Sequence, residues 1–171
     1  MSNEIEFTIG KLLNEHRKKL MIAESCTGGL IGHRITNVPG SSEYYLGSIT
    51  AYAYEAKESL LGVNHDTLLQ FGAVSRETVI EMASGVRKSL SGHFSMNELI
   101  GLSVSGIAGP GGGMPGKPVG LVWFGLSTPE GDHAWKYIWN GDRIENKAVS
   151  ADQGLQLVYD YLTGQLPADM D

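Results

Sequence analysis

The chain has 171 residues, of which 42% are hydrophobic and 19% charged, and its formal net charge is -6. This length fits one domain with a substantial core, and the acidic balance argues against broad binding to nucleic acid or to anionic membranes. Its one cysteine, Cys26, excludes an intrachain disulfide and fits a reducing compartment. No apolar run approaches the roughly 20 residues that span a bilayer, and residues 1–4 lack a signal-peptide pattern, so we expect a cytoplasmic protein.

Helices and strands alternate along the first part of the chain. The apolar spacing from Ile5 to Leu13 predicts a first helix, with the basic pair Lys18-Lys19 near its end. The further elements that we expect are a strand at 20–23, a helix at about 28–36, a strand at 44–53, a short helix at 55–61, a helix from 75 to about 90 and a strand at 99–104.

The last third of the chain predicts a hairpin and a long helix. Strands at 119–128 and 133–140 flank the turn signal at 129–132, a helix covers about 143–162, and the polar tail after Gly164 is expected to fray. The chain contains no internal repeat and no linker, so we expect one domain over residues 1–171. The order of elements predicts an α/β fold: a mixed, mostly parallel sheet with an antiparallel hairpin, flanked by helices in a three-layer αβα sandwich.

Two glycine-rich turns follow predicted strands. The first is Ala-Glu-Ser-Cys-Thr-Gly-Gly at 23–29, where Thr27 is placed to cap the next helix. Unpaired N–H groups at a helix start can hold a phosphate, or stabilise an oxyanion formed by attack from Ser25. The second turn spans 105–116 and matches neither a Walker nor a Rossmann pattern. If the two strands are parallel neighbours, both turns meet at one edge of the sheet; a purely structural loop is the alternative.

Cys26 is a rival nucleophile, because a helix N-terminus lowers a thiol pKa. Adjacent side chains in an extended segment point in opposite directions, so Ser25 and Cys26 do not both face one substrate. We favour Ser25 and assign Cys26 to buried packing. The five histidines show no pairing at metal-ligand spacing, so no metal is expected.

Five motifs in order resemble the CinA carboxy-terminal domain family. They are the run at 23–29, Ala-Lys at 56–57, Gly-Ala-Val-Ser at 72–75, Ser-Gly-Ile-Ala-Gly-Pro at 105–110 and Lys-Pro-Val-Gly at 117–120. The resemblance covers roughly residues 5–162 and is to the stand-alone form, whose members include nicotinamide mononucleotide deamidases.

The resemblance implies an amidohydrolase that makes nicotinate mononucleotide and ammonia in pyridine nucleotide salvage, without a cofactor. Ser25 matches the family's nucleophile and Lys57 its base. A serine hydroxyl needs an adjacent base, and a lysine can serve when burial or nearby positive charge lowers its pKa. Spacing alone would favour a solvated helix position for Lys57.

Further roles also come from the resemblance. Tyr52 could relay a proton or bind the substrate, or it is simply a half-buried aromatic. Tyr54 stands where the family more often has asparagine, and Ser105 where threonine is commoner. Arg143 matches a family arginine that could hold a phosphate, or it is an exposed cap-region residue. The positions expected to contact the substrate are Cys26, Thr27, Gly28, Tyr54, Ser105, Gly106, Ala108, Gly109 and Arg143.

The expected partner is a small pyridine mononucleotide, with neither nucleic acid nor membrane, and we expect a homo-oligomer. Two alternatives remain: a module that binds a pyridine nucleotide or another phosphate ligand without turnover, and a purely structural partner domain.

Overall fold

Five strands form one mixed sheet in the computed structural model, which describes residues 4–170. They are β1 (Lys19–Glu24), β2 (Tyr45–Thr50), β3 (Leu99–Gly106), β4 (Leu121–Thr128) and β5 (Gly131–Ile138), in the spatial order β2-β1-β3-β4-β5. β1 pairs parallel with β2 and with β3, whereas β4 runs antiparallel to both of its neighbours. The α/β fold with a mixed sheet and a terminal hairpin is therefore confirmed.

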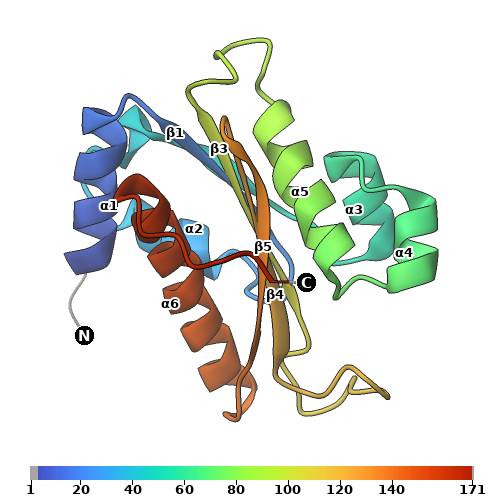
Figure 1. The fold of residues 1–171 in the computed structure, drawn as a ribbon. Coiled ribbons are helices and arrows are strands. Elements are labelled where there is room, and N and C mark those ends of the chain that lie inside the picture. The colour runs from blue at the N-terminus through green and yellow to red at the C-terminus, as the bar shows by residue number, and fades with distance from the viewer. Residues whose placement is uncertain (1–3, 171) are drawn as a thin grey trace.

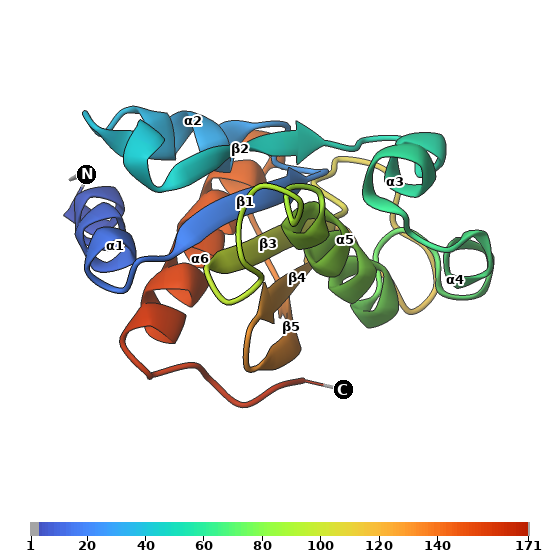
Figure 2. The same ribbon diagram turned by 90° about the horizontal axis from the view of Figure 1, so that it is seen from above.

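Helices cover both faces of this sheet (Figure 1). One layer holds α1 (Glu4–Glu15), α2 (Leu30–Thr36) and α6 (Arg143–Leu162), and the other holds α3 (Tyr54–Leu61), α4 (His65–Phe71) and α5 (Arg76–Lys88). A short 3-10 turn, η1 (Ser41–Glu43), precedes β2. Viewed from above, α3 and α4 lie next to each other beside α5 (Figure 2). Within residues 4–170, no helix is both long and apolar enough to cross a membrane.

Each layer buries the apolar stripe of its helices against one face of the sheet. The larger core cluster joins α1, α2 and α6 to residues such as Ile22, Leu102 and Phe124 of the strands. On the opposite face, α5 packs Met82 and Val86 with Met21 and Ala23 of β1. The central strands are buried on both faces, as a sheet between two helical layers requires.

Two parts of the chain differ from the sequence prediction. The helix α4 was not expected, because its seven residues are too few to show a clear helical period. The tail was expected to fray after Gly164, but residues 167–170 lie against β5. The backbone N–H of Met170 donates to the Ala134 carbonyl at 3.0 Å, and Trp135 Nε1 donates to the Ala168 carbonyl at 3.0 Å. An edge strand has unpaired backbone groups, and the tail satisfies some of them. Residues 1–3, which carry most of the signal-peptide argument, and Asp171 lie outside the described residues.

The carboxyl ends of the parallel strands β1, β2 and β3 lie at the same edge of the sheet, which we call the carboxyl edge. The loops that follow these strands therefore lie together there. β1 lies between β2 and β3, so Ser25 emerges at the centre of this edge. The Ser25 N–H donates to the Val104 carbonyl at 3.0 Å, and the Ala51 N–H donates to the Glu24 carbonyl at 2.9 Å. The turn after β1 is thus held on both sides by the ends of its neighbouring strands.

Candidate active site

The turn after β1 is organised by the buried carboxylate of Glu24. Its Oε2 accepts hydrogen bonds from the Thr27 hydroxyl (2.6 Å) and from the N–H groups of Gly29 (3.0 Å) and Ile31 (3.2 Å). Its Oε1 accepts from the N–H of Gly32 at 2.9 Å. These are N–H groups that the start of a helix leaves unpaired.

Glu24 therefore occupies the helix start that the sequence analysis assigned to a phosphate or an oxyanion. That expectation is wrong for the N–H groups of Gly29 and Ile31, because a carboxylate of the protein already binds them. Thr27 does not cap α2 with its side chain; its hydroxyl donates to Glu24 instead. The signal in the sequence was an acidic residue at the end of a buried strand, directly before a helix start.

The same turn places Ser25 against Lys57, which comes from α3. Lys57 Nζ donates to Ser25 Oγ at 3.0 Å, and it also donates to the carbonyl oxygens of Ala51 at 2.8 Å and Tyr52 at 3.3 Å. Lys57 is 1% exposed and Ser25 is 7% exposed. Two residues that are 32 positions apart in the sequence are thus in hydrogen-bond contact, away from bulk water.

Burial lowers the pKa of Lys57 from its ordinary value of 10.5 to about 8, because a charged amine loses its hydration there. Near pH 8 about half of such a lysine is neutral. A neutral amine keeps two N–H donors, enough for the carbonyls of Ala51 and Tyr52, and presents a lone pair to the Ser25 hydroxyl. The arrangement can therefore remove a proton from the serine.

Cys26 lies in a different environment. Its side chain is 5% exposed and belongs to the core cluster on the α6 side of the sheet. Burial raises the pKa of its thiol from 9.0 to about 12, and the nearby Glu24 charge acts in the same direction. A thiol with this pKa stays protonated near neutral pH and is a poor nucleophile. The cysteine therefore has the buried position that the sequence analysis assigned to it.

Arg143, the first residue of α6, joins two further loops of the site. Its Nη1 donates to the Gly109 carbonyl at 2.7 Å, and its Nη2 donates to the Tyr52 hydroxyl at 2.9 Å. Asn146, one turn later, donates from Nδ2 to the Ala108 carbonyl at 3.0 Å. Tyr52 itself is 60% exposed, and Lys57 contacts its backbone carbonyl. The structure thus brings Tyr52, Gly109 and Arg143 together at the same edge as Ser25.

Two expected substrate contacts are instead bound to the loop at 72–75. The Tyr54 hydroxyl accepts from the Ala73 N–H at 3.1 Å, and the buried Ser105 hydroxyl donates to the Ala73 carbonyl at 2.7 Å. Both side chains therefore brace this loop with their polar groups. A Cβ on Gly106 would come within 2.6 Å of Val122, so close packing of β3 against β4 explains this glycine.

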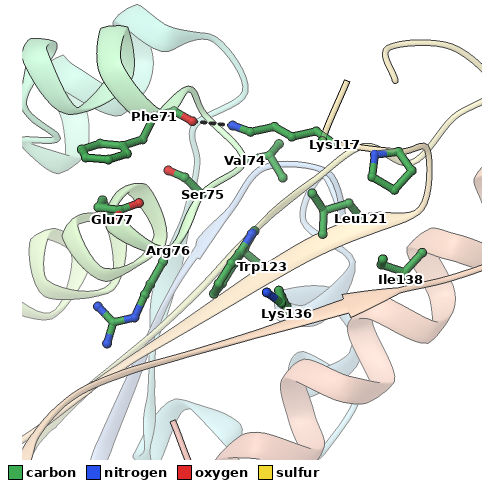
Figure 3. A pocket seen from close by; sticks show the side chains of 12 residues that line it. Phe71, Val74, Ser75, Arg76, Glu77, Lys117, Leu121, Trp123, Lys136 and Ile138 are labelled. Carbon is green, nitrogen blue, oxygen red and sulfur yellow. Dashed lines mark hydrogen bonds between the residues drawn. The ribbon is translucent and has the colours of Figure 1, made fainter. Parts of the chain in front are cut away.

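A separate cavity of about 400 Å³ lies between the start of α5 and the β4–β5 hairpin. Figure 3 shows Lys117 reaching across its mouth, where the ammonium binds the Phe71 carbonyl, and Lys136 beside Trp123. Its described lining includes no predicted site residue; it consists of Phe71, Val74, Ser75, Arg76, Glu77, Gly116, Lys117, Pro118, Leu121, Trp123, Lys136 and Ile138. Within residues 4–170, no group of three or more His, Cys, Asp or Glu side chains is placed to hold a metal ion.

Nearly the whole chain is similar to known proteins. The family model described as the CinA C-terminal domain matches residues 2–162. A relative from Halothermothrix orenii is 49% identical over 155 residues, which cover 90% of this chain and 36% of the relative. A CinA-like protein from Salinibacter ruber is 44% identical over 152 residues, covering 89% of this chain and 35% of that protein. The chain therefore spans about a third of the length of these relatives.

Solved structures have the same fold over almost their full length. The crystal structure of a competence-damaged protein (CinA) superfamily protein from Klebsiella pneumoniae matches with a TM-score of 0.86 and 28% sequence identity. The match covers 95% of this chain and 98% of that one.

Proposed function

The chain belongs to the CinA C-terminal domain family, and on that premise we propose that it is an amidohydrolase. In this proposal it hydrolyses nicotinamide mononucleotide to nicotinate mononucleotide and ammonia, a reaction of pyridine nucleotide salvage. The substrate comes from the resemblance of the motifs to deamidases of the family. The chemistry depends on one observation, the buried contact of 3.0 Å between Lys57 Nζ and Ser25 Oγ.

The first half of the proposed reaction forms an acyl-enzyme. Neutral Lys57 accepts the hydroxyl proton of Ser25 while Oγ attacks the carboxamide carbon. The backbone N–H groups of Cys26 and Thr27, next to Ser25 in the chain, are proposed donors to the resulting oxyanion. The C–N bond then breaks, and protonated Lys57 gives its proton to the departing amine, which leaves as ammonia.

The second half hydrolyses the ester between Ser25 and the nicotinoyl group. Lys57 accepts a proton from a water molecule that attacks the ester carbon, and the same proton returns to Oγ as the C–O bond breaks. Tyr52 is a weaker candidate for these proton transfers, because its hydroxyl is bound to Arg143 and Lys57 contacts only its backbone. Tyr52 is better suited to positioning Arg143.

Arg143 is proposed to bind the phosphate of the substrate. Its guanidinium has five N–H donors, of which two are used on Gly109 and Tyr52. The remaining donors fit a phosphate, which arginine binds in a bidentate manner. The carbonyls of Ala108 and Gly109 are bound to α6, so this loop orients Arg143 in the proposed site.

The test is ammonia release from nicotinamide mononucleotide by the purified protein, with chromatography for nicotinate mononucleotide. We expect Ser25→Ala and Lys57→Ala each to lower kcat by about a thousandfold or more, since a nucleophile and its base act as a unit. Cys26→Ala is the matched control and should retain most of the activity, because its thiol is buried and protonated.

Two results would contradict the proposal: turnover by Ser25→Ala at the wild-type rate, or no turnover by a folded wild-type protein. In the second case, binding of nicotinamide mononucleotide without ammonia release would support the alternative of a non-catalytic pyridine-nucleotide module.

A further inference from the structure

A second cation lies at the end of the site where Arg143 is found. Lys147 follows Arg143 by four residues on α6, so the two side chains share one face of the helix. Lys147 Nζ lies 3.8 Å from the position that a Cβ on Gly28 would occupy. The ammonium therefore reaches the turn that follows Ser25, while Arg143 reaches Gly109 and Tyr52.

The space between Lys147 and this turn depends on the absence of a side chain at position 28. Gly28 has a φ of 65°, a left-handed conformation that side chains rarely adopt. A Cβ there would face the Lys147 ammonium at van der Waals distance. Because glycine has no side chain, the ammonium faces the backbone of the turn directly.

The two cations are unfavourably placed for α6 itself. Like charges four residues apart repel each other, and the first turns of a helix favour negative rather than positive charge. Neither Arg143 nor Lys147 forms an ion pair with a carboxylate in the described part of the chain. The acids of this helix start, Asp142 and Glu145, bind the backbone N–H groups of residues 142, 144 and 145 instead. An anionic ligand would remove the repulsion.

We propose that Lys147 and Arg143 together bind the phosphate monoester of the substrate. A phosphate monoester carries a charge of about −1.5 to −2 near neutral pH, which two cations can balance. Lys147 is then a specificity-determining residue that favours the nucleotide over the unphosphorylated nucleoside. The identity of the nucleotide rests on the proposed function, whereas binding of a sugar phosphate by the two cations does not require turnover.

The test is calorimetric titration of ribose 5-phosphate into the protein in a buffer without phosphate. We expect Lys147→Gln to weaken binding about tenfold, which corresponds to about 1.4 kcal/mol, and Lys147→Arg to retain it. The matched control is Lys11→Gln, which removes the same charge from an exposed position of α1 and should leave binding unchanged. Thermal unfolding of each variant checks that it is folded.

Kinetics provide a second readout that a merely structural role would not change. We expect Lys147→Gln to raise KM for nicotinamide mononucleotide about tenfold with kcat unchanged, and to leave KM for nicotinamide riboside as in the wild type. The proposal is overturned if the wild type does not bind ribose 5-phosphate, or if Lys147→Gln binds it equally well. Binding that depends on Lys147 without any ammonia release would reject the proposed function and retain the phosphate subsite.

Discussion

At the scale of single residues, the chemistry of the site depends on how Lys57 is surrounded. Its amine is nearly inaccessible to solvent, and three oxygen atoms, those of Ser25 Oγ and of the Ala51 and Tyr52 carbonyls, lie within hydrogen-bond distance. Burial penalises the charged ammonium and lowers the pKa to about 8. The same oxygens hold the amine in place, so a base of suitable strength remains directed at the serine.

This environment predicts a pH dependence. Below pH 8 Lys57 is mostly protonated and cannot accept the serine proton, so kcat/KM should rise with pH and level off above a midpoint near 8. An ordinary lysine would place this midpoint near 10.5. The measurement is ammonia release over a range of about pH 6 to 10. The proposed base would be rejected by a profile that is flat across pH 8.

The control for this prediction is Lys57→Arg, which should be inactive at every pH because a guanidinium stays protonated. Folding stability gives an independent check. Between pH 8 and 10.5 the unfolded chain binds a proton that folded Lys57 has released, so the contribution of Lys57 to the free energy of unfolding should rise with pH in this window. Urea unfolding of the wild type and of Lys57→Met, each at pH 8 and at pH 10.5, would isolate this contribution.

At the scale of elements, three glycines allow α5 to approach its neighbours closely. A Cβ on Gly85 would overlap the Leu61 carbonyl at the end of α3, and one on Gly101 or Gly125 would overlap carbonyls of α5 itself. These glycines allow close contact between α5, α3 and the strands β3 and β4. Because α3 carries Lys57, this packing also sets the position of the proposed base.

Gly85→Ala tests this packing. Alanine raises helix propensity by about 1 kcal/mol, but the clash with Leu61 must displace backbone, and overpacking costs about 1–3 kcal/mol or more. We therefore expect a lower free energy of unfolding in urea, and a lower kcat because α3 shifts with Lys57. Ser84→Ala, on the same helix, is the matched control and should be neutral or slightly stabilising. If Gly85→Ala is as stable as the wild type, α3 can move away from the new methyl group without lowering the free energy of unfolding, and the prediction is wrong.

At the scale of the whole molecule, the C-terminal tail connects the two helical layers across the edge of the sheet. It leaves the end of α6, passes β5 and reaches the start of α5 (Figure 1). The Asp169 carboxylate accepts from the Ala134 N–H at 2.6 Å and from Arg76 Nη2 at 2.8 Å. The described tail residues therefore cover the edge strand β5 and connect it to the layer that holds α3, α4 and α5.

Deleting residues 165–171 should therefore destabilise the fold. The indole N–H of Trp135 and the N–H of Ala134 then bond to water instead of the tail, and each lost hydrogen bond costs about 0.5–1.5 kcal/mol. We expect a lower Tm, with ammonia release at low temperature retained because the tail contacts lie on β5 and Arg76. Asp169→Ala, which removes only the carboxylate contacts, should produce part of the loss. An unchanged Tm after the deletion would mean that the tail adds nothing to stability.

The sequence alone determined the features that local pattern encodes. Helical and strand periodicity predicted β1, β3, the hairpin and the long helices, since these periods record which face of each element is buried. The turn at 23–29 was found from its own residues, and Cys26 within it was correctly assigned to the core. The pairing of Ser25 with Lys57 was predicted from family resemblance, because spacing alone favoured an exposed lysine.

The tertiary structure decided which distant groups meet. Only the strand order β2-β1-β3 brings Ser25 between the ends of its neighbours and next to α3. The same folding directs Glu24 onto the start of α2, binds Tyr54 and Ser105 to Ala73, and places Lys147 over Gly28. Each of these contacts joins a side chain to the backbone of another segment, and the local sequence of that side chain is compatible with several partners. Their geometry follows from the packing of whole layers. The spacing of apolar residues within one helix or strand does not contain this information.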